Sequence, residues 1–248
     1  MKKIKIHSIT TLVLFSIVFF HCKQKEPFKA KASFSIDKRE EIISTKNTDR
    51  SYRTLFISCD SIYPGKNYFV TQIKFNDTLD DENIDNTLFI FGVDKSGIKT
   101  ELFRDSIFSQ FLEIKFEDFN NDSIPDILVE NTSSARSNLT YYLYLMCLNK
   151  TKLKKIRKFE TIPNPEYDKE YNIVSNYVLT GVNYTNFYSI VNNKIIDYHI
   201  TIEDNQSEDP NSVEDNQPNP KYIKAIKNIM RSKTYKRANI SGPISACN

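Results

Sequence analysis

Short runs of β-branched and aromatic residues, separated by polar turns, recur through the middle of the chain. In the last run Ile196, Tyr198, Ile200 and Ile202 recur at every second position. This period is typical of a strand, and no stretch of residues 52–202 keeps a helical period. Strands are therefore predicted at residues 68–75, 88–93, 98–103, 111–116, 127–129, 141–148, 154–159, 173–179, 187–191 and 194–202.

Two of the intervening turns contain residues suited to tight hairpins. Gly97 ends the sequence Asp94-Lys95-Ser96-Gly97, where glycine can supply the left-handed conformation of a short hairpin loop. Asn192 and Asn193 separate the last two runs, and asparagine also tolerates a positive φ. This succession of hairpins predicts an all-β domain with a degenerate β-propeller-like architecture, for which a β-sandwich is the alternative.

The N-terminal residues are typical of an export signal. Three lysines, the last of them Lys5, precede the apolar residues 9–20, which end just before Cys22. A cysteine at this place predicts a lipoprotein-type signal peptide over residues 1–22, with Cys22 as the lipidation site. An ordinary cleaved signal and an uncleaved anchor are the alternatives. Residues 23–51, rich in Lys, Glu, Ser and Thr, are predicted to form a flexible tether.

The predicted β-domain covers residues 52–202 and is followed by a change in composition. Residues 203–220 contain six acidic residues, three prolines and no basic residue, which predicts an acidic disordered linker. Residues 221–248 are predicted to form a basic amphipathic helix and a tail. The apolar stripe of this helix includes Ile226 and Ile229. Such a helix can lie on anionic lipid or dock on the β-domain, and docking is the interpretation we favour.

Charge and cysteine content exclude little. The net charge is +3, with lysines interspersed among acids, so a nucleic-acid surface is not indicated. After Cys22 the chain has Cys59, Cys147 and Cys247. Cys147 lies in an apolar run, which favours a buried free thiol. If an exported chain forms a disulfide here, the first pair to test is Cys59 with Cys247.

The common catalytic signatures are absent from the sequence, so we do not expect an enzyme. Two of the three histidines lie in the signal region, and His199 is predicted to face solvent on a strand. The chain has no Gly-x-Ser-x-Gly motif, no cluster of His and Cys ligands, and only five scattered glycines. A hydrolase that uses a carboxylate pair leaves no such signature and stays open as an alternative.

The most informative group of side-chain oxygens lies in the sequence Glu117-Asp118-Phe119-Asn120-Asn121-Asp122-Ser123-Ile124-Pro125-Asp126. Four side chains occupy loop positions 1, 3, 5 and 9, and a backbone carbonyl occupies position 7, which is the ligand spacing of an EF-hand-like calcium loop. The sequence therefore predicts a Ca²⁺ site whose ligands are Asp118, Asn120, Asp122, Ile124 through its carbonyl, and Asp126.

This loop differs from an EF-hand at two positions. Ser123 stands at position 6, where glycine normally makes the turn, and Val129 stands at position 12, where a bidentate glutamate is usual. Fewer protein oxygens predict an affinity in the extracellular range of roughly 0.1 to 1 mM. A positive φ at Ser123 would cost on the order of 1 kcal/mol.

From Asp118 to Val129 the sequence resembles the Asp-x-Asn-x-Asp-Gly-x-x-Asp-hydrophobic unit of FG-GAP/VCBS-type calcium repeats. The order of loop, polar Asn/Ser segment, Tyr-rich strand and the sequence at residues 163–168 is similar to a group of exported bacterial lipoproteins. That resemblance, over residues 111–202, implies a degenerate propeller-like fold with one calcium loop. Some members of the group are immunity proteins that inhibit lysozyme-like hydrolases, but no inhibitory residues carry over.

These observations predict a lipid-anchored protein of the bacterial cell envelope, periplasmic or on the outer membrane. Its expected partner is a protein, which the resemblance suggests is a cell-wall hydrolase. The polar residues 131–138 and the following strand supply candidate contacts in Arg136, Tyr141 and Tyr142, although tyrosines packed in the sheet are the simpler interpretation. A surface adhesin or ligand-binding lipoprotein is the alternative.

Overall fold

The computed structural model describes residues 38–44, 51–75, 84–191, 193–204 and 220–235. The chain divides into two compact units, Met1–Ser33 and Phe34–Asn248, and every described residue lies in the second. The predicted signal peptide with its lipidation site Cys22 therefore lies outside the described residues, as do most of the predicted linker and the C-terminal tail.

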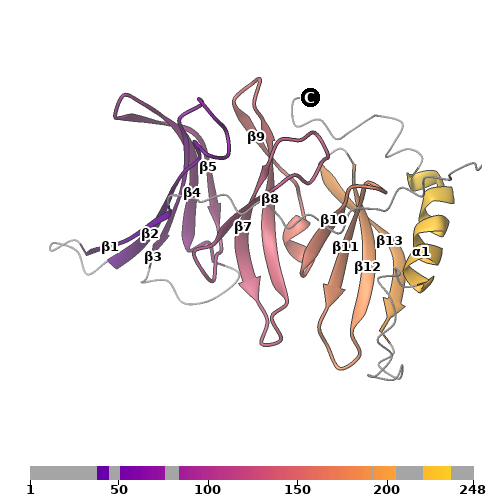
Figure 1. Cartoon of the computed structure of the whole chain (residues 1–248). Helices are drawn as coiled ribbons and strands as arrows, with labels where there is room; N and C mark the ends of the chain where they lie inside the picture. Colours follow the sequence, from indigo (N-terminus) through magenta and orange to yellow (C-terminus); the bar gives the residue numbers. More distant parts are fainter. Residues whose placement is uncertain (1–37, 45–50, 76–83, 192, 205–219, 236–248) are drawn as a thin grey trace, which may run out of the picture. The chain divides into compact units, whose positions relative to one another are not determined.

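The described residues form three antiparallel sheets in which neighbouring strands follow one another in sequence, together with one C-terminal helix (Figure 1). An all-β domain with a short helix is thus confirmed. Consecutive four-stranded meanders are the units from which propeller blades are built. The first sheet has five strands: β1 (Lys38–Ser44), β2 (Ser51–Ser58), β3 (Tyr68–Phe75), β4 (Thr87–Lys95) and β5 (Ile98–Ile107).

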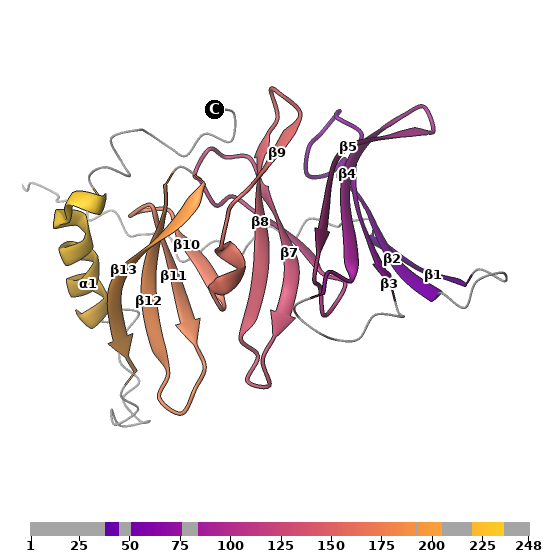
Figure 2. The same ribbon diagram turned by 180° about the vertical axis from the view of Figure 1, so that it is seen from behind.

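The second and third sheets have four strands each. The second contains β6 (Ile114–Glu117), β7 (Asp126–Ser133), β8 (Leu139–Cys147) and β9 (Lys152–Lys155). A short 3₁₀ turn, η1 (Phe159–Thr161), leads to the third, which contains β10 (Pro165–Asp168), β11 (Ile173–Val178), β12 (Tyr184–Val191) and β13 (Lys194–Glu203). Figure 2 shows β7 beside β8 and β11 beside β12.

Three strands were not predicted, and one of them corrects a predicted boundary. β1 lies within residues 23–51, the predicted flexible tether, and pairs with β2 along its whole length, from Lys38 opposite Ile57 to Ser44 opposite Ser51. The strand exists because the edge of β2 offers it backbone partners, a tertiary contact that local composition does not reveal. β2 and β10 were also not predicted. β13 begins at the predicted residue and ends one residue later, and α1 (Pro220–Arg231) begins one residue before its predicted start.

Sheet packing explains why some strands alternate and others are apolar throughout. One core cluster joins Val70 and Phe89 of the first sheet to Val129 and Met146 of the second. Another joins Leu143 and the far side of the second sheet to the third. The second sheet is therefore buried on both faces, and for that reason residues 127–129 of β7 and 141–147 of β8 are apolar without alternation.

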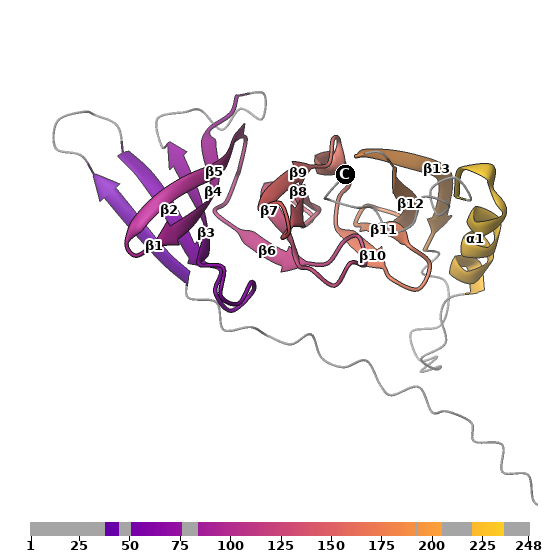
Figure 3. The ribbon, with the colours of Figure 1, turned by 90° about the horizontal axis from the view of Figure 1, so that it is seen from above.

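A third cluster places α1 against the third sheet. Ala225, Ile226 and Ile229 of the helix are buried with Ile173 and Phe187, and α1 contacts β13. Figures 1 and 3 both show α1 alongside β13. The predicted docking of the apolar stripe on the β-domain is confirmed. Among the described residues, no helix has the length and apolar character that a membrane crossing requires.

The cysteines correct two expectations. Cys59 is a free, fully buried thiol, so the expected pairing of Cys59 with Cys247 is wrong. Cys147, expected to be a free thiol, is instead disulfide-bonded although it is also fully buried. Sequence separation did not identify the bonded cysteine because disulfide formation depends on which side chains the fold brings together.

Candidate metal-binding loop

The predicted calcium loop connects β6 to β7 and is held by all three sheets. From the first sheet's β2–β3 connection, the Tyr63 hydroxyl donates a 2.7 Å hydrogen bond to the Pro125 carbonyl. From β8 of the second sheet, the Met146 N–H donates to Asp126 Oδ1 at 2.9 Å. Beyond β10 of the third, Lys169 Nζ lies 3.3 Å from an Asp118 carboxylate oxygen. The loop is therefore a common point of contact for the three sheets.

The local turn follows the pattern of an EF-hand-like loop. Ser123 has a φ of 66°, so the residue at position 6 adopts the left-handed conformation that the ligand spacing predicted. Its N–H donates to Asp118 Oδ2 at 3.1 Å. The Asn120 N–H donates to Asp118 Oδ1, and the Ile124 N–H donates to Asp122 Oδ1 at 2.9 Å. These bonds to side-chain oxygens curl the backbone around positions 1 to 7.

Asp126 is the buried end of the loop. Its side chain is completely inaccessible, and its two oxygens accept from the Phe119 and Met146 N–H groups. Burial raises the pKa of this carboxyl to about 8 despite those two bonds, and the nearby Asp122 and Asp118 carboxylates raise it further. Asp126 thus ties the loop to β8, and three acidic side chains lie close enough to influence one another.

The predicted ligands fit a hard cation in chemical type and in their order along the loop. In the described residues, no three His, Cys, Asp or Glu side chains converge in a metal-binding arrangement. The loop oxygens are engaged with backbone N–H groups, with the Asn120 amide and with Lys169, whose ammonium pairs with Asp118. A cation that entered the loop would compete with Lys169 for Asp118, and Ca²⁺ is the ion whose ligand preferences match this donor set.

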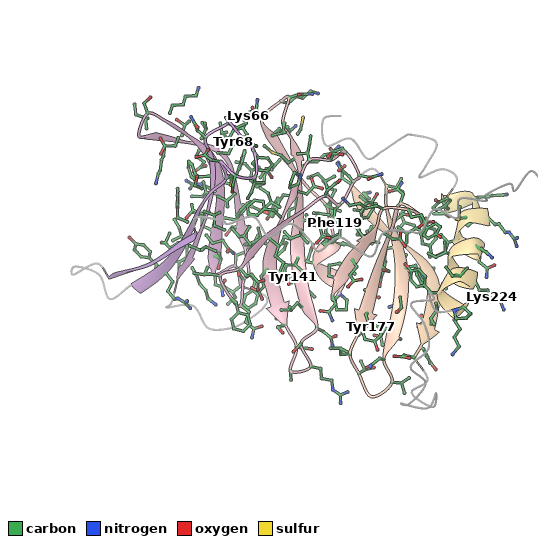
Figure 4. All side chains as sticks on the ribbon, viewed as in Figure 1. Lys66, Tyr68, Phe119, Tyr141, Tyr177 and Lys224 are labelled. Atoms are coloured by element: carbon green, nitrogen blue, oxygen red, sulfur yellow. The ribbon has the colours of Figure 1, made fainter. Side chains whose placement is uncertain are left out.

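The three predicted partner contacts do not form one surface. Arg136 is exposed in the turn between β7 and β8, which is closed by a bond from the Ser137 N–H to the Ser134 carbonyl. Tyr141 (Figure 4) is buried, with its hydroxyl bonded to Lys115. Tyr142 packs on the opposite face of β8. Successive residues of a strand point to opposite faces, so both tyrosines pack against the sheet. Of the three predicted contacts, only Arg136 is exposed to solvent.

Two contacts of the loop were not predicted. Tyr63 lies in the connection between β2 and β3, and Lys169 follows β10, so both are distant from the loop in sequence. Neither belongs to a motif, and only the packing of the three sheets brings them to the loop. His199, by contrast, is exposed on β13 as the alternation predicted.

A separate cleft lies on the outer side of the first sheet. Its volume is about 460 Å³. Phe56 and Phe69 are stacked in its lining with ring centroids 5.6 Å apart, and Lys99 Nζ lies 4.1 Å from the Phe56 ring. The carboxylates of Asp60 and Asp94 also line it. Aromatic rings beside polar groups can hold a small polar ligand.

Searches of protein-family models, of curated proteins and of solved structures found no match to this chain.

Proposed function

We propose that this chain is a membrane-anchored, exported lipoprotein whose β-domain is stabilised by Ca²⁺ and binds a protein partner without catalysing a reaction. The observation that carries the calcium part is the position of the loop, which contacts all three sheets through Tyr63, Met146 and Lys169. A cation held there would stiffen the point at which the sheets meet. Lipidation at Cys22 and export rest on the sequence pattern alone.

A melting experiment tests the calcium part. The compact unit of residues 34–248 contains all three described cores, so it can be studied without the N-terminal segment. With an affinity of roughly 0.1 to 1 mM, 10 mM Ca²⁺ would stabilise the folded state by about 1.4 to 2.7 kcal/mol. The midpoint should then rise by about 3 to 10 °C over the value in chelator.

Two variants make this result specific. Asp122→Ala should abolish the calcium response, because Asp122 supplies the ligand at position 5 of the loop. Asp85→Ala removes an exposed carboxylate outside the loop and should leave the response intact. A midpoint that is the same with Ca²⁺ and with chelator would remove calcium from the proposal. An equal loss of response in both variants would mean that the effect is non-specific screening.

The partner we propose is a cell-wall hydrolase, blocked sterically. This part is supported by the resemblance of residues 111–202 to a lipoprotein group that includes hydrolase inhibitors. The exposed Arg136 in the β7–β8 turn is the predicted contact that remains available. Unit 34–248 should inhibit a lysozyme-like hydrolase in a cell-wall lysis assay, and Arg136→Glu should weaken the inhibition. Undiminished lysis at saturating protein and calcium would reject this partner class.

The cleft on the first sheet favours a second candidate, a ligand-binding lipoprotein. Its Phe56–Phe69 stack, the Lys99 ammonium and two carboxylates form a polar and aromatic lining. In the structure Asp94 accepts from the Gly97 N–H and Asp60 from the Ser58 hydroxyl, so both carboxylates stabilise local turns. Calorimetric screening of soluble glycans would test this candidate, and Phe56→Ala, which removes one ring of the lining, should abolish any binding found. Turnover of a glycan lost in Asp60→Asn would instead support the hydrolase alternative.

A further inference from the structure

The C-terminal part of the chain concentrates positive charge. Residues 216–248 contain seven Lys and Arg residues and no Asp or Glu. In the compact unit, the preceding residues 34–215 contain 20 Lys and Arg against 30 Asp and Glu, which gives a net charge of 20 − 30 = −10. The charges of the unit are therefore segregated along its sequence, although its total of −10 + 7 = −3 hides this separation.

Besides Lys221, four of the seven cations are exposed side chains on and just after α1. We call these residues the cationic face: Lys224, Lys227, Arg231 and Lys233. None of them forms an ion pair with any described residue. The helix itself contains no acidic residue that could neutralise them.

The packing of the helix fixes the direction of this face. The opposite side of α1 is buried through Ala225, Ile226 and Ile229. The Tyr222 ring packs 5.2 Å from that of Phe187, and its hydroxyl donates to Asp168 at 3.1 Å. The apolar stripe is thus used inside the protein and cannot enter a bilayer while the helix stays docked. The cations are presented outward together with Asn228 and Met230, and Figure 4 shows Lys224 on this outer side.

We propose that the cationic face binds the anionic phospholipid headgroups of the membrane to which the chain is anchored. Clusters of four or more Lys and Arg residues beside a membrane attract anionic lipid, by about fivefold in affinity for each cation. The inference rests on the proposed lipid anchor, because a tether converts this weak contact into an intramolecular one. Contact through α1 would give the unit a preferred orientation on the negatively charged surface.

A vesicle experiment without the anchor tests this surface alone. Unit 34–248 is mixed with vesicles of phosphatidylcholine, with and without phosphatidylglycerol, and sedimented at low and high salt. A unit of net charge −3 should be repelled by an anionic surface unless a local cationic face docks on it. We expect binding that requires phosphatidylglycerol and that is lost at high salt.

Two charge-matched variants locate the contact. Lys224→Glu combined with Lys227→Glu should lower the affinity tenfold or more. Lys66→Glu combined with Lys95→Glu changes two exposed lysines of the first sheet and makes the same change in net charge, so it should preserve binding. Thermal melting confirms that both variants are folded. An equal loss in both variants, or equal binding to phosphatidylcholine alone, would overturn the proposal.

Other results would also decide against the cationic face. Binding to soluble polyphosphate but to neither vesicle would assign it to an anionic polymer. Binding that appears only after the acids of residues 203–215 are neutralised would mean that the linker occupies it. The anchor is judged independently, by mass spectrometry of the N-terminal peptide from the full chain. The vesicle test can therefore fail while Cys22 is found to be lipidated. Equally, the unit can bind vesicles while the N-terminal peptide carries no lipid.

Discussion

The Tyr63 hydroxyl donates a 2.7 Å hydrogen bond to the Pro125 carbonyl, across 62 positions of sequence. Tyr63 is almost completely buried and packs edge-on against Phe116 of β6, with ring centroids 6.4 Å apart. Burial and the nearby carboxylates hold the pKa of its phenol well above the usual value, so it remains a donor at any physiological pH. This single side chain joins the first sheet to the loop that precedes β7.

Removing that hydroxyl should weaken both the fold and the loop. Tyr63→Phe leaves the Pro125 carbonyl without this donor, and we expect a loss of about 1–2 kcal/mol in the free energy of unfolding. Tyr177→Phe removes an exposed hydroxyl that bonds Asp204, and should cost little. Urea denaturation of both variants measures the difference. Equal costs would show that the Tyr63 bond has no special role.

Glu130 should make the protein less stable as pH rises. Its side chain is inaccessible, Oε2 accepts from the Phe111 N–H and the Ser109 hydroxyl, and Oε1 has no partner within the described residues. Burial raises the pKa of this carboxyl. The folded state therefore binds a proton more tightly than the unfolded state, and stability falls as pH rises from the unfolded pKa of about 4.3 toward the folded pKa.

Glu130→Gln tests this effect because it keeps an oxygen acceptor and removes the charge. The advantage of the variant over the native chain should grow with pH above about 4.3, by at most ~1.4 kcal/mol per pH unit. Chemical denaturation across a pH series measures it, with the partly exposed Glu113→Gln as the control. A constant difference at all pH values would contradict an ionisation effect.

Among the glycines that the structure describes, Gly92 is predicted to be the least replaceable. A Cβ built there would lie 2.4 Å from Phe69 Cζ and 2.6 Å from the Thr100 carbonyl oxygen, which is backbone and cannot move aside. Gly92→Ala should destabilise the fold by about 1–3 kcal/mol. A Cβ added at Gly181 would meet no atom within 4 Å, so Gly181→Ala should be neutral or slightly stabilising. Urea midpoints of the two variants decide between these expectations.

Cysteine reactivity should separate the two described cysteines. Burial raises the pKa of the Cys59 thiol to about 12, so Cys59 should resist iodoacetamide in the folded protein. In denaturant without reductant the Cys59 peptide should become alkylated, whereas the Cys147 peptide should react only after reduction. Peptide mass spectrometry shows the order of modification. Alkylation of Cys147 before reduction would contradict its disulfide.

The strands that sequence predicted best are those whose burial pattern follows from their own residues. β13 alternates because one face packs under α1 and the other is exposed, whereas residues 127–129 of β7 and 141–147 of β8 are apolar because both faces of their sheet are covered. Gly97 and Ser123 also adopt the left-handed conformations that their turn positions predicted. β1 and β10 were not predicted, because they form through backbone pairing with β2 and β11 and show no local sequence pattern of a strand.

By itself, the sequence determined the period of the strands, the turns between them and the order of oxygen donors from Asp118 to Asp126. These properties depend on neighbouring residues, and short-range sterics and hydrogen bonding decide them. Only the tertiary structure decided that Tyr63, Met146 and Lys169 meet at this loop, that Tyr141 and Tyr142 face opposite cores, and which cysteine is bonded. Those relations arise from the stacking of whole sheets, where burial of apolar surface sets which distant residues become neighbours.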